Sequence, residues 1–392
     1  MNVIELARTG RRLPALGLAG VLLIATPAAL AQEARLPSER EAPIAHLVDI
    51  SSGQVLFSRH ADRRFVPASV TKVMTLMLAF DMMEEGTLAP GRVITVSEDI
   101  AEAWSGVGSS MRLEAGDMVS VHDLLIAIAT GSANDASVVL AQAAAGSVED
   151  WTRAMTARAR ELGLTQSHFG TPNGWPDEGR TFVTARDLVT LAEAIIERHP
   201  ERFRTYIGRK EVSYRGFTRV NQDPLIGRVR GGDGIKTGFT NEAGFGFLGT
   251  AKRGDQRLVV VIGGSYSGRE RNAAARGLVE WGFSQFERRA LYAKAASVSE
   301  ARVQNGNMRA VGLVTDRPVI VNVPQGAGGE LSLTVRYDGP LRAPIAAGEQ
   351  IATLVITAPG MAPARVPLVA REEVKEANLF ERIANGVVGW FT

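Results

Sequence analysis

Ser69 and Lys72 are the residues whose types and spacing most directly suggest chemistry. They lie at the start of the stretch Pro67–Gly86, which is rich in helix-forming residues. Residues three apart on a helix share a face, so the hydroxyl and the amine come within reach of each other. Apolar residues occur on nearly every side of this stretch, which indicates a buried helix. Burial lowers the pKa of a lysine, and a neutral lysine beside a serine is a general base beside its nucleophile.

Two other short stretches carry side chains that would complete such a site. Ser132-Ala133-Asn134 falls at the break between predicted helices at 121–129 and 135–145. Lys236-Thr237-Gly238 begins a predicted three-stranded stretch. Strict alternation along that strand would place Lys236 and Gly238 on one face and Thr237 on the other. Ser-x-x-Lys is a loose pattern, so the interpretation depends on the three stretches together.

In this order and with these separations, the three stretches resemble the penicillin-binding proteins and the serine β-lactamases. The likeness extends to residues 232–244 and to Gly268-Arg269-Glu270, which are similar to the low-molecular-mass D-alanyl-D-alanine carboxypeptidases. It covers essentially the whole chain. The sequence departs from the family pattern at Ala133, where glycine is common, and carries Phe239 at a position that varies in the family.

The resemblance implies how the reacting groups would work. Ser69 would form an acyl-enzyme with the penultimate D-alanine carbonyl of a peptidoglycan stem pentapeptide, and the terminal D-alanine would leave. Lys72 would be the general base, and Ser132 would relay protons toward the leaving amine. The backbone N–H groups of Ser69 and Phe239 would form the oxyanion hole. β-Lactam antibiotics would acylate the same serine as covalent inhibitors.

The resemblance also implies which residues would bind the substrate. Asn134 would orient the peptide through its amide, and Lys236 would supply positive charge. Thr237 and Arg269 would meet the terminal carboxylate, which suits the forked donors of an arginine. Gly238 would let the substrate lie close along the strand, because it has no side chain in the way.

The order of elements predicts an α/β (α+β) catalytic domain of the penicillin-binding-protein/β-lactamase type at residues 32–290. Short β-type runs punctuated by Pro and Gly follow at 291–370 and predict a small all-β sandwich. Residues 371–392 predict a C-terminal amphipathic helix whose bulky apolar side chains gather largely on one side. Its charges exclude a bilayer-spanning helix, so we expect it to lie in the membrane surface, with docking on its own β-domain as the alternative.

Residues 1–31 predict an export signal. Arg8, Arg11 and Arg12 precede an apolar run that ends in Ala29-Leu30-Ala31, a small-residue cleavage pattern. We therefore expect cleavage after Ala31 and a mature protein on the periplasmic face of the cytoplasmic membrane, peripherally anchored. The sequence does not decide between the general and the twin-arginine export routes.

Composition excludes several other classes of function. The chain has 392 residues, no cysteine and a pI of about 9.0. The excess of basic side chains lies in residues 1–31, and no basic stripe follows, so we expect no nucleic-acid partner. The five histidines are scattered without metal-ligand spacing, and we expect no metal and no cofactor. Residues 244–249 match G-x-G-x-x-G but lie within β-type sequence, where the dinucleotide fingerprint does not occur.

Two rival functions stay open at this stage. A serine β-lactamase would need a glutamate for deacylation, and the loop at 171–179 contains Glu178 without the expected neighbours. A non-catalytic cell-wall-binding relative would have lost reactive side chains, whereas this chain keeps the whole set. Hydrolysis of a penicillin and labelling of Ser69 by a penicillin distinguish these alternatives.

Overall fold

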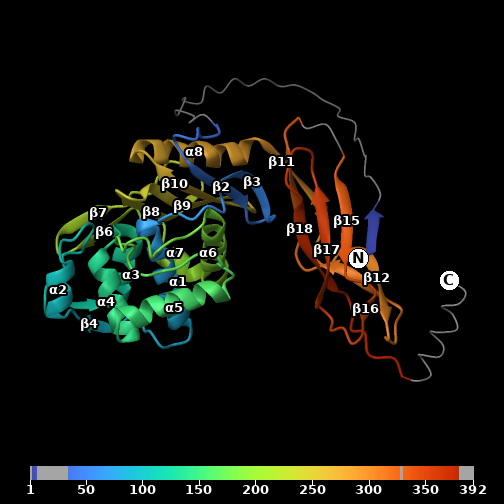
Figure 1. The fold of residues 1–392 in the computed structure, drawn as a ribbon, viewed down its shortest axis with the longest axis horizontal. Coiled ribbons are helices and arrows are strands. Elements are labelled where there is room, and N and C mark those ends of the chain that lie inside the picture. Colours follow the sequence, from blue (N-terminus) through green and yellow to red (C-terminus); the bar gives the residue numbers. More distant parts are fainter. Residues whose placement is uncertain (1, 7–33, 327–329, 379–392) are drawn as a thin grey trace, which may run out of the picture. The chain divides into compact units, whose positions relative to one another are not determined.

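The computed structural model describes residues 2–6, 34–326 and 330–378 and divides the chain into two compact units (Figure 1). The site unit comprises Gln32–Ile50 and Leu56–Ser284, and the β unit comprises the remaining segments, including Ser51–Val55. The division at Ser284 comes six residues before the predicted boundary at 290. The reason is that β11 (Phe286–Tyr292) pairs with β14 (Val319–Pro324), which binds residues 286–292 to the β unit.

A five-stranded sheet forms the centre of the site unit. Its strands follow the order β3-β2-β10-β9-β8, and the β2–β10, β10–β9 and β9–β8 pairs are antiparallel. β8 is therefore an edge strand, with one side free of other strands in the sheet. The bounds are β2 (Ile44–Asp49), β3 (Gln54–Arg59), β8 (Gly232–Thr240), β9 (Gly244–Arg253) and β10 (Gln256–Ser265).

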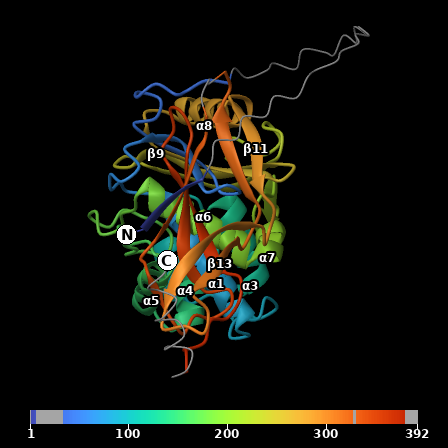
Figure 2. The same cartoon turned by 90° about the vertical axis from the view of Figure 1, so that its right-hand side faces the viewer.

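Helices cover both faces of this sheet. α8 (Gly268–Ser284) packs on one face and α6 (Ala185–Arg198) on the other, as both views show (Figures 1 and 2). The run Val259-Val260-Val261 is fully buried, because a strand covered on both faces has no polar side. Gly282 lets α8 approach closely, since a Cβ there would lie 2.6 Å from Cδ2 of Leu47.

The rest of the site unit is a helical lobe built around α1 (Lys72–Glu84). Phe80 and Trp151 are fully buried there. The predicted helix at 121–129 is divided into α3 (Val121–Ile126) and a π-helical turn, η2 (Ala127–Gly131). The other elements are η1 (Ala68–Thr71), α2 (Glu98–Trp104), α4 (Asn134–Ala145), α5 (Val148–Glu161), α7 (Pro200–Tyr206), β4 (Val93–Thr95), β5 (Met118–Ser120), β6 (Glu211–Tyr214) and β7 (Phe217–Val220).

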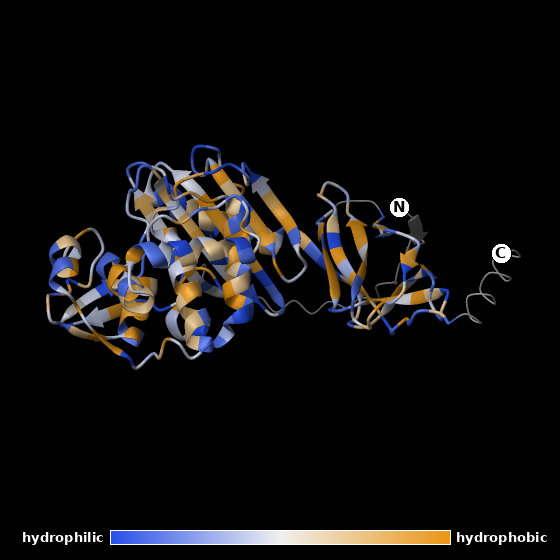
Figure 3. Ribbon diagram, turned by 60° about the horizontal axis from the view of Figure 1, so that its bottom comes forward, coloured by the Kyte–Doolittle hydropathy of each residue, from blue (hydrophilic) through white to orange (hydrophobic). Residues whose placement is uncertain are grey.

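The β unit confirms the predicted β-rich domain. A seven-stranded sheet has the order β1-β15-β17-β18-β13-β12-β16, and its core includes the fully buried Val311, Leu354 and Leu368. Apolar residues line these strands in Figure 3. β1 (Asn2–Leu6) lies within the predicted export signal and pairs with β15. The remaining strands are β12 (Ser297–Gln304), β13 (Ala310–Thr315), β15 (Ser332–Tyr337), β16 (Leu341–Arg342), β17 (Gln350–Thr357) and β18 (Ala364–Ala370).

The predicted start of the C-terminal helix at Arg371 is wrong. Residues 371–378 are not helical, and Val374 is fully buried in the core of the β unit, where it bridges Ile345. Glu376 bridges Gly306 in the same way. This segment belongs to the β unit because it supplies part of its core. Residues 379–392, the rest of the predicted anchor, lie outside the described residues. No helix in the described ranges is long and apolar enough to cross a membrane.

Candidate active site

Ser69 and Lys72 meet at the junction of η1 and α1. The Nζ of Lys72 lies 2.9 Å from the Oγ of Ser69. It also donates to Oδ1 of Asn134 at 2.8 Å and to the backbone carbonyl of Asn173 at 2.6 Å. Two acceptors and one hydroxyl match a neutral amine, which donates two hydrogen bonds and keeps a lone pair for the hydroxyl proton. The geometry is that of a nucleophile with its base.

Burial sets the protonation of Lys72. Its side chain is fully buried at the start of α1. This burial lowers the pKa of Lys72 well below its usual value, and the positive charge of Lys236 lowers the pKa further, while Asp135 opposes both. A lysine in these surroundings gives up its proton far more readily than one in water, which lets it act as a base near neutral pH.

Ser132 and Asn134 reach the site because the helical run of α3 and η2 ends at Gly131, just before them. Ser132 lies just after this π-helical turn with φ of 59°, in the left-handed region that is costly for a residue with a Cβ. Asn134 begins α4, and its Nδ2 donates to the carbonyl of Val107 at 3.0 Å while its Oδ1 accepts from Lys72. Such turns are frequent at functional sites, where they aim a side chain.

Asp135 is a positioning residue that sequence reasoning did not select for the site. It is buried, and its carboxylate accepts from the hydroxyl of Ser110 at 2.7 Å and from the backbone N–H groups of Met111 and Leu113. These bonds hold the loop before residue 113 against the start of α4. That loop supplies Gly108 and Ser109 to the wall of the cleft.

The loop at 171–179 closes the site behind Lys72. The hydroxyl of Thr75 donates to the carbonyl of Pro172 at 2.6 Å, which fixes the loop to α1. Gly174 has φ of +74°, and a Cβ there would lie 1.9 Å from the carbonyl oxygen of Ala68. Only glycine allows this approach, which brings the Asn173 carbonyl to Lys72. Sequence reasoning missed Asn173, because a backbone acceptor leaves no signal in residue type.

The edge strand β8 forms the opposite wall. The cleft is lined by four consecutive residues of β8: Lys236, Thr237, Gly238 and Phe239. The edge position and twist of the strand therefore overcome the strict alternation that would turn Thr237 away. A Cβ at Gly238 would lie 2.5 Å from the carbonyl oxygen of Pro67. Gly238 is therefore required first for packing β8 against η1.

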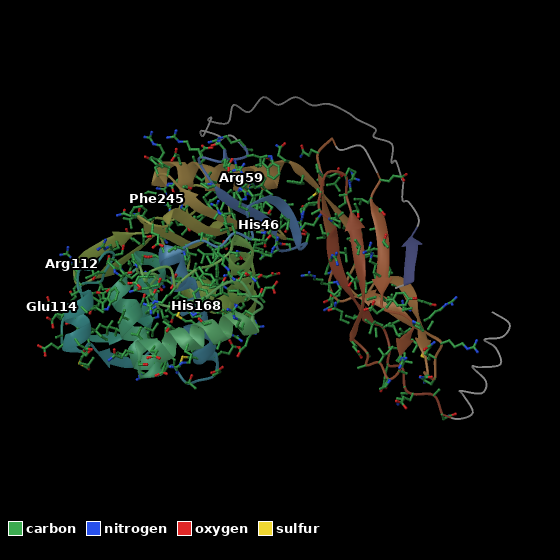
Figure 4. The ribbon with its side chains drawn as sticks, viewed as in Figure 1. His46, Arg59, Arg112, Glu114, His168 and Phe245 are labelled. Atoms are coloured by element: carbon green, nitrogen blue, oxygen red, sulfur yellow. The ribbon has the colours of Figure 1, made fainter. Side chains whose placement is uncertain are left out.

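Phe239 is half exposed at the cleft and rests on a neighbouring strand. Its ring stacks on that of Phe245, with centroids 4.1 Å apart. Phe245, labelled in Figure 4, comes from β9 and lines the cleft as well. Trp175, 40% exposed, lines the cleft from the loop at 171–179. Substrate entering the cleft thus meets aromatic side chains from β8, β9 and the loop at 171–179.

Three charged residues are buried at the β8 side of the cleft: Lys236 on β8 itself, Arg271 on α8, and Asp223. Burial lowers the pKa of Lys236 to about 7, and the charge of Arg271 adds to this effect while Asp223 opposes it. Burial also lowers the pKa of Arg271 to about 10. Burial raises the pKa of Asp223 to about 6, although its carboxylate accepts from the N–H groups of Leu225 and Ile226. Near neutral pH this cluster is poised to attract an anion.

The cleft contains Arg271 in the place that sequence reasoning gave to Arg269. Arg269 is exposed and is not among the described residues that line the cleft. Arg271 is 5% exposed, lines the cleft and donates to the carbonyl of Gly246 at 3.1 Å. Arg269 and Arg271 are two residues apart on α8, which corresponds to about 200° around the helix axis, so their side chains lie on opposite faces. Helical spacing from the apolar residues that form the buried face of α8 would have placed Arg271 on that face.

The cleft has a volume of about 660 Å³ and brings together every predicted site residue except Arg269 and the fully buried Lys72 behind Ser69. Glu178 is exposed and is not among its described lining residues. Within the described part of the chain, no group of three or more His, Cys, Asp or Glu side chains could hold a metal ion. The arrangement can acylate a serine and attract a carboxylate.

Family models match both units. A model described as D-alanyl-D-alanine carboxypeptidase matches residues 30–266, and one described as the C-terminal domain of penicillin-binding protein 5 matches residues 286–376. The chain is 30% identical over 390 residues to D-alanyl-D-alanine carboxypeptidase DacF of Bacillus subtilis (strain 168), which covers 97% of this chain and 99% of that protein. It is 31% identical over 342 residues to DacA of Escherichia coli (strain K12), covering 86% and 84%.

Solved structures agree. Penicillin-binding protein 5 from Haemophilus influenzae superposes with a TM-score of 0.75 at 28% identity, covering 87% of this chain and 100% of that chain. Penicillin-binding protein D2 from Listeria monocytogenes, in its ampicillin-bound form, superposes with a TM-score of 0.57 at 28% identity and covers 64% of this chain and 100% of that chain.

Proposed function

Since the chain belongs to the D-alanyl-D-alanine carboxypeptidase family, we propose that Ser69 is its nucleophile and Lys72 the general base. The protein is a serine-type D-alanyl-D-alanine carboxypeptidase of the penicillin-binding-protein 5 type. The Oγ of Ser69 attacks the carbonyl of the penultimate D-alanine while Nζ of Lys72 takes its proton. The observation that carries this assignment is the 2.9 Å separation of these atoms at a fully buried lysine.

Collapse of the tetrahedral intermediate breaks the peptide bond. The leaving amine takes a proton through Ser132, whose left-handed backbone aims it into the cleft, and D-alanine departs. Water then attacks the ester on Ser69, with Lys72 again accepting a proton, and the shortened peptide is released. The net reaction adds one water molecule across one peptide bond.

Backbone and cationic groups stabilise the negative charges of this reaction. The N–H groups of Ser69 and Phe239 receive the oxyanion, and the first of these lies in the opening turn of η1. Thr237, Lys236 and Arg271 receive the terminal carboxylate. Arg271 takes the role first given to Arg269, because it lines the cleft and Arg269 does not.

The substrate is a peptidoglycan stem pentapeptide that ends in D-Ala-D-Ala, and Asn134 orients it. β-Lactams acylate Ser69 in the same geometry, as the ampicillin-bound form of the Listeria monocytogenes relative supports. Rapid hydrolysis of a β-lactam is disfavoured, because no carboxylate is found among the described residues that line the cleft.

The site of action is the periplasmic face of the cytoplasmic membrane. Residues 1–31 direct export and are removed, which would take β1 with them. Residues 379–392, with Phe380, Ile383 and Trp390 among their apolar side chains, anchor the protein on the membrane surface. The similarity to D-alanyl-D-alanine carboxypeptidases supports this location, since trimming of stem peptides in the assembled cell wall takes place outside the cytoplasm.

Release of D-alanine from a pentapeptide ending in D-Ala-D-Ala tests the proposed function. The wild-type protein should release one D-alanine per peptide, and Ser69→Ala should release none above the uncatalysed rate. A second reading uses a fluorescent penicillin, which should label the wild type and leave Ser69→Ala unlabelled. Turnover by Ser69→Ala, or labelling at another residue, would remove Ser69 from its role.

A further inference from the structure

The walls of the cleft carry an excess of positive charge. Lys236, Arg219 and Arg271 line the cleft, and no Asp or Glu is found among its described lining residues. Such a one-signed cleft attracts anions and concentrates them near the reacting groups. A peptide with a single terminal carboxylate, however, supplies only one negative charge.

Two of the three cations are accounted for at the β8 end of the cleft. Lys236 and Arg271 interact electrostatically with Asp223, which is 2% exposed and ionised above pH of about 6. Arg271 is tied to the carbonyl of Gly246, which pairs with Gly238 across the strands. One internal negative charge and one substrate carboxylate therefore balance these two cations.

Arg219 is the cation left over, and it enters from a different wall. It lies on β7, opposite Val212 of β6, and its side chain is exposed. Its stem runs beside Gly131, where an added Cβ would lie 3.7 Å from the Cβ of Arg219. It therefore approaches the turn that precedes Ser132.

Arg219 has no counter-ion of its own. The guanidinium of Arg219 makes no hydrogen bond or ion pair with another residue in the parts of the chain that the structure describes, and only its backbone is paired, with Val212. By contrast, Arg215 of the same hairpin pairs with Asp117 at 2.7 Å. An unpaired guanidinium on the wall of a substrate cleft is free to take a carboxylate from the substrate.

We propose that Arg219 binds a second carboxylate of the stem peptide, in addition to the terminal one. This inference rests on the proposed function, because it assigns a preference to the same cleft. The carboxylate belongs to one of two residues. It is the side-chain carboxylate of a dicarboxylic diamino acid at the third position, or the free α-carboxylate of a γ-linked glutamate at the second. The enzyme would thus favour stem peptides that carry the extra anion over lysine-containing or amidated ones.

Two matched pairs of pentapeptides test this preference through kcat/KM for D-alanine release. One pair differs at the third residue, meso-diaminopimelate against lysine. The other differs at the second, γ-linked glutamate against its α-amide. The wild type should prefer the anionic member of one pair by about five- to tenfold, the size expected for a partly exposed charge-assisted pair. Arg219→Gln should reduce that ratio to within about twofold, and Arg219→Glu should invert it.

Arg215→Gln is the matched control, since it removes the same charge from the same hairpin outside the cleft. It should keep the wild-type ratio. Equal ratios in the wild type and Arg219→Gln for both pairs would overturn the proposal, as would an equal loss with all four peptides. If the wild type released D-alanine from none of the four peptides, the proposed function itself would fail. The two failures are therefore distinguishable.

Discussion

Two buried lysines have opposite tasks in this site. Lys72 must lose its proton to act as a base, and its carbonyl and amide acceptors suit the neutral amine. Lys236 must keep its proton to attract a carboxylate, and Asp223 raises its pKa against the effect of burial. The difference arises from surroundings, because the two residues are chemically identical.

The alkaline side of the pH profile should report Lys236. Its pKa is lowered to about 7, so its protonated fraction, and with it carboxylate binding, falls as pH rises through that value. We expect kcat/KM for a peptide ending in D-Ala-D-Ala to decline from about pH 7 to about pH 9 relative to the same peptide with a C-terminal carboxamide. The ratio cancels the titration of Lys72, which acts on both peptides. A ratio that is constant with pH would contradict the assignment of Lys236.

Local spacing predicted the pairing of Ser69 with Lys72, and the family resemblance predicted the distant Ser132, Asn134 and 236–239, but groups that act through a backbone atom or through burial were missed. Ser69 and Lys72 are one helical turn apart, so their contact follows from the chain itself. Asn173 offers only a carbonyl, and Asp223 reaches the site through burial, neither of which residue type reveals. Arg269 was predicted from the resemblance at Gly268-Arg269-Glu270, and such a short motif does not show which side chains of α8 face the cleft.

At the scale of elements, the site depends on how closely η1 is packed. Gly174 and Gly238 approach η1 from two sides, each at a distance that a Cβ would not allow. Ser69 is thus held between the loop at 171–179 and the edge of β8. Helices and strands with regular hydrophobic period were predictable from sequence. The break before Ser132 was also predicted, but the π-helical turn η2 that forms it was not. η2 packs against β6 and β7, contacts between distant segments that local periodicity does not reveal.

Gly174→Ala should damage both stability and acylation, and Gly179→Ala should be milder. Both residues have positive φ, 74° and 76°, so both variants bear a left-handed cost of about 1 to 2 kcal/mol. A Cβ at Gly174 meets the carbonyl of Ala68, whereas nothing lies within 4 Å at Gly179. The clash should add about 1 to 3 kcal/mol of lost unfolding free energy.

Chemical denaturation and the rate of penicillin acylation measure these two effects. Gly174→Ala should also slow acylation, because the shift of the loop moves η1 and the Asn173 carbonyl. Gly179→Ala should acylate at close to the wild-type rate. Equal losses of stability and rate in the two variants would show that the approach of Gly174 to η1 is unimportant.

At the scale of the whole molecule, the chain combines a catalytic unit with a β-rich unit that carries no described reactive cluster. The change from helical spacing to short β-type runs predicted this division. The observed boundary at Ser284 comes before the predicted one at 290, because β11 pairs within the β unit. Residues 371–378 also belong to the β unit, because Val374 is buried in its core. Val374 and Ala377 are the buried residues of this segment, and their apolar character was read as the start of an amphipathic helix although it serves the core of the β unit.

A protein that ends at Asn378 should lose membrane binding and keep its stability. In liposome flotation, the mature full-length chain should float and this shortened chain should stay in the dense fraction. A second truncation after Ala370 should also lower the melting temperature, because it removes Val374 from the core of the β unit. Equal flotation of the full-length chain and the chain ending at Asn378 would reject residues 379–392 as the anchor.

The central claim is that Lys72 acts as the base for Ser69, and Lys72→Arg tests it most directly. Arginine stays protonated where Lys72 is the neutral base and does not accept the serine proton, so D-alanine release from the pentapeptide should fall by about 10²- to 10⁴-fold. Lys252→Arg, an exposed lysine at the end of β9, is the matched control and should retain the wild-type rate. Near-normal release by Lys72→Arg would contradict the claim.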